Sequence, residues 1–147
     1  MFIAEFLYHS LYGEQANEPM FDYIYDSLQW FDGSPSPTAN FHLVFMMRLS
    51  LFLGFYPNLD DYVSGCVFDL RNGSFSSVAP LHSDYLLPDE ASQMSLMMRM
   101  NYPTMHLFKF TRAQRNRLLD VIVQYYRLHI PGFPDMKSLD VLRNIYD

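Results

Sequence analysis

The sequence predicts a mainly α protein, a compact helical domain of about five to six helices into which a small β-hairpin is inserted. The first observation behind this prediction is that apolar residues recur at helical spacing through most of the chain. The second is a single short stretch that departs from that spacing, around an Asn-Gly pair at residues 72 and 73. With 147 residues, 50% of them apolar and 18% charged, the chain can bury a sizeable core. We expect residues 1–147 to form one domain with the hairpin near 64–79.

The first expected helix covers residues 2–12, where Ile3, Phe6, Leu7 and Leu11 follow the spacing of one helix face. This helix starts without a Ser, Thr, Asp or Asn that could accept hydrogen bonds from its first N–H groups. Two interpretations stay open. Either a preceding segment has been removed, or an initiator Met opens a frayed helix.

Two further helices are expected before the hairpin. One begins near residues 17–19, with Pro in its first turn, and ends where the prolines of residues 32–37 stop it. The next covers about 41–53, and it is apolar nearly all round. A helix of this kind is buried, so we expect it at the centre of the fold, with Gly54 as the residue that follows its C-terminus.

The hairpin is expected to pair residues 66–70 with 74–77 around Asn72-Gly73, a pair that readily takes the positive φ angles of a tight turn. Helical spacing returns at residues 88–100 and again after Thr111, which opens a capping box with Gln114. The prolines of residues 131–134 end that long helix. Ser138 is then expected to cap a last short helix reaching Ile145.

Charge and cysteine content exclude several function classes. Ten Lys and Arg against sixteen Asp and Glu give a net charge of −6, so any contact with nucleic acid has to come from a local basic patch. The single cysteine, Cys66, can form neither an internal disulfide nor a multi-thiolate zinc site, and this suits a reducing compartment. The N-terminus has no basic leader, and the most apolar stretch, residues 41–55, is too short to span a bilayer. We expect a cytoplasmic protein that does not contact membranes.

The sequence does not predict an enzyme. Cys66 lies in an expected strand without a neighbouring base in sequence, so we interpret it as a small buried hydrophobe rather than a nucleophile. Among the five histidines only His82 approaches a metal-ligand spacing, with Asp84, and a chance pairing in a loop is the favoured interpretation. No Gly-rich phosphate loop, zinc-protease motif or pair of catalytic carboxylates is present.

The densest basic segment lies at the start of the long helix. It holds Lys109, Arg112, Arg115 and Arg117, four of the ten basic residues. The positive end of the helix adds to their field, so this segment could bind a phosphate or a carboxylate. The equal alternative is a solvated helix face.

Six methionines lie within two of the expected helices. They are Met46, Met47, Met94, Met97, Met98 and Met100. We expect them to fill gaps in the core, with an exposed peptide-binding groove as the lesser alternative.

Four segments resemble the C-terminal region of the RecO family of DNA repair proteins. Residues 125–142, YYRLHIPGFPDMKSLDVL, resemble the closing segment of that family. Residues 51–57 look like its Leu-Gly-Tyr/Phe-x-Pro helix end, residues 68–75 like its hairpin, and residues 2–7 like the helix that opens its helical region. The resemblance therefore covers essentially the whole chain.

The sequence departs from the family pattern in two places. Zinc-binding members carry paired cysteines before and after the hairpin, whereas this chain has Ser76, Ser77 and Ala79 after it and only Cys66 before it. We expect no zinc and no other cofactor. Family members also begin with an OB-fold, a small barrel that binds single-stranded DNA, and no residues before Phe2 could form one.

The resemblance implies a recombination mediator of the bacterial cytoplasm, one that acts with RecR and often RecF to displace single-strand-binding protein (SSB), load recombinase and anneal strands. It implies a partner peptide as well, the acidic tail of SSB, which ends in an apolar residue and a free carboxylate. Such a tail requires an apolar groove with a cation at its edge. Two sets of residues fit on chemical grounds, Phe45, Arg48, Leu49 and Phe52 in one place and Lys109, Arg112 and Arg115 in the other.

Binding of single-stranded DNA is expected to be weak without the OB-fold. The alternative is a purely structural domain that supports an absent OB-fold and contacts RecR, without binding SSB or DNA itself.

Overall fold

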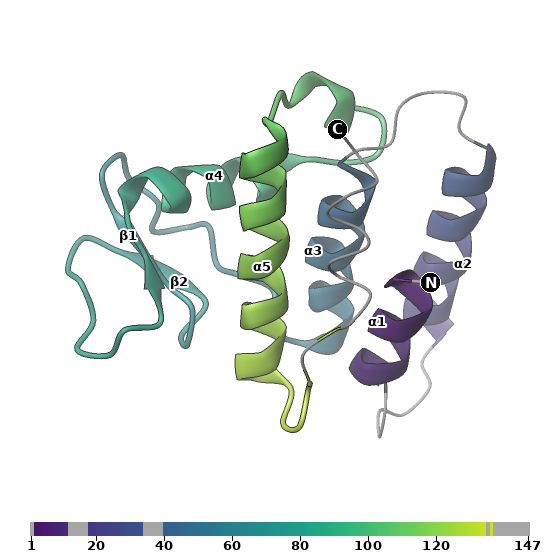
Figure 1. Ribbon diagram of the computed structural model, residues 1–147, viewed down its shortest axis with the longest axis horizontal. Helices are drawn as coiled ribbons and strands as arrows, with labels where there is room; N and C mark the ends of the chain where they lie inside the picture. The colour runs from purple at the N-terminus through teal and green to yellow at the C-terminus, as the bar shows by residue number, and fades with distance from the viewer. Residues whose placement is uncertain (1, 12–17, 34–39, 135, 137–147) are drawn as a thin grey trace.

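A computed structural model describes residues 2–11, 18–33, 40–134 and 136 of the chain (Figure 1). The described elements follow one another as α1 (Phe2–Leu11), α2 (Glu18–Gly33), α3 (Phe41–Leu53), β1 (Val67–Asp69), β2 (Ser74–Ser76), β3 (Tyr85–Leu86), α4 (Pro88–Arg99), the 3-10 helix η1 (Met105–Leu107) and α5 (Arg112–His129). The fold is mainly α with one small antiparallel sheet, as the sequence predicts. Within these ranges no helix combines the length and the apolar character needed to cross a bilayer.

Helix α3 forms the centre of the core. It packs against α2, α4 and α5, and Figure 1 shows it between α5 and α2. Nine of its thirteen residues are buried, as expected for a helix that is apolar on all sides. Gly54 ends the helix in the left-handed conformation, with φ of 95°, and its N–H donates to the Ser50 carbonyl over 3.0 Å. The predicted central helix and its glycine C-terminus are both confirmed.

The six methionines fill the interior around α3. Every one of them is at most 5% exposed. Flexible thioether side chains adapt to irregular gaps between helices, so this burial confirms the core interpretation, and none of these six methionines lines an exposed groove.

The sheet has the strand order β2-β1-β3 and projects beside the helices in Figure 1. In the hairpin, Val67 pairs with Ser76 and Asp69 with Ser74, so four residues, 70–73, connect β1 to β2. The hairpin forms where it was predicted, but the expectation of positive φ angles at both residues of its turn was wrong. Of the Asn72-Gly73 pair only Gly73 has a positive φ, of 66°, because a four-residue connection needs the left-handed conformation at its last position alone.

Asp69 holds the hairpin turn. Its carboxylate accepts hydrogen bonds from the backbone N–H groups of Arg71 and Asn72, over 2.9 and 3.1 Å. Its carbonyl accepts the N–H of Gly73 over 2.8 Å. The aspartate side chain thus accepts hydrogen bonds from turn N–H groups that have no strand partner.

Several predictions concern residues outside the described ranges. The last residue of the first expected helix at position 12, the prolines of 34–37 and the last short helix at 138–145 belong to this group. So do the later residues of the closing segment that resembles the RecO family.

Candidate functional site

The basic segment lies where η1 leads into α5. Thr111 caps α5 through a reciprocal pair of hydrogen bonds, in which its hydroxyl accepts from the Gln114 N–H over 3.1 Å and the Gln114 side chain accepts from the Thr111 N–H over 2.8 Å. The capping box predicted from the sequence is therefore confirmed. It fixes where the helix begins and which turn carries each cation.

The structure divides the four predicted cations into two groups. Lys109 and Arg112 are exposed, and Arg115 is half-buried, with its Nη1 donating to the Phe110 carbonyl over 2.9 Å. Arg117 instead forms a two-point ion pair with Glu90 of α4, over 2.6 and 3.0 Å. Hydrogen bonding to that carboxylate raises the pKa of Arg117. Since the carboxylate of Glu90 pairs with Arg117, this cation is turned towards α4 and is set apart from the other three.

An exposed apolar side chain accompanies these three cations. Leu107, the last residue of η1, is 65% exposed. The hydrogen bond from Arg115 to the Phe110 carbonyl brings its guanidinium back against the segment that follows Leu107. We call Leu107, Lys109, Arg112 and Arg115 the basic edge. It combines one exposed apolar side chain with positive charge within nine residues of the chain.

The other predicted peptide site, on α3, is filled by the fold itself. Phe45 and Leu49 have no exposed surface, and Phe52 is half-buried with its ring stacked on Tyr23 at 5.0 Å. In this conformation neither Phe45 nor Leu49 can contact a peptide. The apolar character of α3 accounts for this burial, since most faces of such a helix pack against its neighbours, and among its apolar side chains Leu51 is the one that is largely exposed, at 58%.

Arg48 has a structural role in α3. Its Nε and Nη2 both donate to the Met100 carbonyl, over 3.2 and 2.8 Å, where α4 has just ended. This guanidinium satisfies a carbonyl that the helix end leaves without an intrahelical partner. These hydrogen bonds indicate a structural role for Arg48, so we expect its removal to lower stability as well as any peptide affinity.

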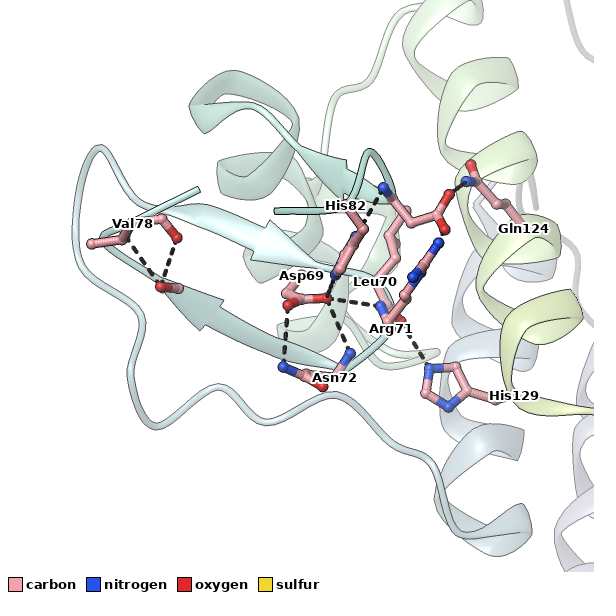
Figure 2. Close-up of polar contacts among 10 residues, drawn as sticks. Asp69, Leu70, Arg71, Asn72, Val78, His82, Gln124 and His129 are labelled. Carbon is pink, nitrogen blue, oxygen red and sulfur yellow. Dashed lines mark hydrogen bonds and ion pairs between the residues drawn. The ribbon is translucent and has the colours of Figure 1, made fainter. Parts of the chain in front are cut away.

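The hairpin region contains a polar cluster in place of a metal site (Figure 2). His82 accepts the Asp84 N–H at Nδ1 over 3.1 Å, and its Nε2 lies 3.1 Å from the Asp69 carboxylate. Cys66 is buried, with 2% of its surface exposed. Among the described residues no three His, Cys, Asp or Glu side chains are arranged to hold a metal ion. One cysteine and a His-Asp pair with satisfied hydrogen bonds do not fit the tetrahedral zinc site of the family.

The same cluster ties the hairpin to α5, a connection that sequence reasoning missed. The Asp84 carboxylate accepts from Arg71 Nε over 2.8 Å and from Gln124 Nε2 over 3.3 Å. His129 Nε2 lies 2.8 Å from the Leu70 carbonyl, as Figure 2 shows. Residues up to 59 positions apart form these hydrogen bonds, so no short sequence motif indicates them. The cluster positions the sheet against α5.

Comparisons with known proteins agree with this architecture. A family model described as "Recombination protein O C terminal" matches residues 1–140. Proteins named DNA repair protein RecO are 54% identical in Phocaeicola vulgatus, over 99% of this chain, and 55% identical in Bacteroides fragilis, over all of it. A RecO from Porphyromonas gingivalis is 36% identical over the whole chain. In each case the chain spans 61% of the length of the relative. No solved structure matches the chain.

Proposed function

The chain belongs to the RecO family, whose C-terminal region it matches, and from that premise we propose that it serves DNA repair and recombination as the partner-recruiting part of a mediator. In this role it acts by binding and catalyses no reaction. Its partner is the acidic C-terminal tail of SSB. The observation that carries this proposal is the basic edge, in which exposed Leu107 and the exposed cations Lys109 and Arg112 follow one another within six residues, where η1 leads into α5.

The chemistry of the tail matches this surface. A free carboxylate and acidic side chains form strong, charge-assisted hydrogen bonds with Arg and Lys. A terminal apolar residue needs an apolar contact close to those cations, which Leu107 provides. We therefore place the tail on the basic edge rather than on α3, whose candidate residues Phe45 and Leu49 are buried.

Single-stranded DNA is the weaker ligand in this proposal. The chain has a net charge of −6, and the basic edge offers only three cations. Three neutralised phosphates correspond to a log–log salt slope of about −2, so any DNA complex should dissociate at moderate salt. RecR is a further proposed partner, to which the structure assigns no surface.

The experiment is a low-salt titration of this chain with a labelled SSB tail peptide, run beside a labelled single-stranded oligonucleotide. We expect saturable binding of the peptide and weak, salt-sensitive binding of the oligonucleotide. Arg112→Glu should reduce peptide affinity by about tenfold, since it replaces attraction by repulsion at the basic edge. The matched control is Arg127→Glu, an exposed position on the same helix, which should change affinity less than about twofold. Equal losses in both variants would contradict the proposed site.

The burial of the α3 candidates favours one alternative function. A helix whose Phe45 and Leu49 side chains are used in packing suits a purely structural domain, which would support other parts of a RecO protein and contact RecR. Absence of binding to both peptide and oligonucleotide, together with capture of purified RecR, would establish this alternative over our proposal.

A further inference from the structure

The outward face of α2 combines exposed aromatic rings with carboxylates. Helix α2 buries Met20, Ile24 and Ser27 against the core. The helical period then places the following residues on the opposite side: Glu18, Phe21, Asp22, Tyr25, Asp26, Gln29 and Asp32. Phe21 is 49% and Tyr25 64% exposed. Figure 1 shows α2 at the edge of the helical bundle, beyond α3. We call these seven residues the α2 stripe.

The α2 stripe is unfavourable for an isolated helix. Glu18 and Asp22, and again Asp22 and Asp26, are like charges four residues apart, which destabilise a helix. No Lys or Arg occurs within α2 to relieve this repulsion, and no cation among the described residues forms an ion pair with its carboxylates. An exposed apolar patch rimmed by charge is typical of an interaction surface. Both unfavourable features would be relieved by one kind of partner.

We propose that the α2 stripe docks a basic, amphipathic segment of a partner protein. Apolar side chains of that segment pack on Phe21 and Tyr25, which are both exposed and lie one helical turn apart. Lys or Arg side chains of the same segment lie beside Asp22 and Asp26, and an Arg can also stack on the Tyr25 ring.

Charge complementarity selects this class of partner. Four carboxylates on one helix repel an acidic peptide and a nucleic-acid backbone alike. The α2 stripe is therefore a second surface, distinct from the basic edge and of opposite sign. A chain with both surfaces can bind an acidic peptide and a basic partner together, so this inference goes beyond the proposed function and does not depend on it.

The test uses a labelled model peptide of Leu and Lys, spaced so that Leu lies on one face of a helix and Lys on the other. This peptide is titrated into the chain at low salt. We expect saturable binding that Asp22→Lys/Asp26→Lys weakens by about tenfold. The matched control is Asp60→Lys/Asp61→Lys, which makes the same change of charge at two exposed acids between α3 and β1. That control should alter affinity less than about twofold.

A second pair of variants tests the apolar part of the surface. Tyr25→Ser should lower the affinity for the peptide by about fivefold. Tyr8 is an equally exposed tyrosine on α1, and Tyr8→Ser should leave the affinity unchanged. Both side chains are 64% exposed, so neither substitution should unfold the chain. Equal losses in the two aspartate variants, or failure of the wild type to bind saturably, would overturn the proposal. Binding of the SSB tail peptide should be unaffected by Asp22→Lys/Asp26→Lys, so the two proposals fail separately.

Discussion

Gly73 lies directly against α5, and replacing it by Ala should test how the hairpin is anchored. A Cβ at this position would lie 2.5 Å from the hydroxyl oxygen of Tyr125, well inside a van der Waals contact. The backbone φ of 66° is also in the region that side chains disfavour. Tyr125 cannot move without cost, because its hydroxyl donates to the Phe55 carbonyl.

The expected loss of stability for Gly73→Ala has two parts. Forcing a side chain into the left-handed region costs about 1 kcal/mol. Displacing the Tyr125 hydroxyl from the Phe55 carbonyl costs about 1 kcal/mol more. The free energy of unfolding should therefore fall by about 2 kcal/mol in total. Gly65→Ala is the matched control, since Gly65 has φ of 85° with no atom within 4 Å of its Cβ position, and it should show the backbone cost alone.

A double-mutant cycle with Tyr125→Phe separates the two parts. Without the hydroxyl, the nearest Tyr125 atom to the new Cβ is Cζ at 3.5 Å, an ordinary contact. In that background Gly73→Ala should cost only about 1 kcal/mol, giving a coupling of about 1 kcal/mol by urea denaturation. Additive effects of the two substitutions would refute the proposed packing of the hairpin on α5.

Three further predictions concern stability. Arg48→Ala should lower the free energy of unfolding by about 1–2 kcal/mol, since it removes two hydrogen bonds from the Met100 carbonyl, and an unchanged urea midpoint would contradict that role. Asp69→Ala should cost about 2–3 kcal/mol, because the turn N–H groups and His82 lose their acceptor, and hydrogen exchange at residues 71 and 72 should accelerate. Burial lowers the pKa of His42 from 6.5 to about 4. Between these two values the unfolded chain binds a proton at His42 that the folded chain does not, so the free energy of unfolding should decrease as the pH falls from 6.5 towards 4. The expected loss is about 3 kcal/mol relative to His42→Gln. A wild type and His42→Gln that lose stability in parallel would show that His42 is not the cause.

Much of the fold follows from local patterns. The apolar spacing of α3, the Thr111 capping box and Gly54 each act within a few residues, so the sequence alone placed them correctly. Strand β3 was not predicted, because its two residues, Tyr85 and Leu86, are too few to show an alternation.

The candidate site was harder to predict because its electrostatics depend on distant partners. Arg117 looked equivalent to Arg112 in sequence, yet Glu90, 27 residues away, balances its charge. Arg48 looked available for a ligand, yet Met100, 52 residues away, accepts its hydrogen bonds. Tertiary packing decides such pairings. A basic residue in the sequence therefore indicates only a possible ligand contact, and the fold determines whether its side chain is used within the protein.

The most direct test of the account is amide chemical-shift mapping of the isotope-labelled chain during titration with the SSB tail peptide. We predict that saturable shifts gather at residues 107–115, around the basic edge, and that α2 is unaffected. Shifts gathered on α2 or α3, or no shifts at saturating peptide, would contradict the claim that this chain recruits an acidic tail through the start of α5.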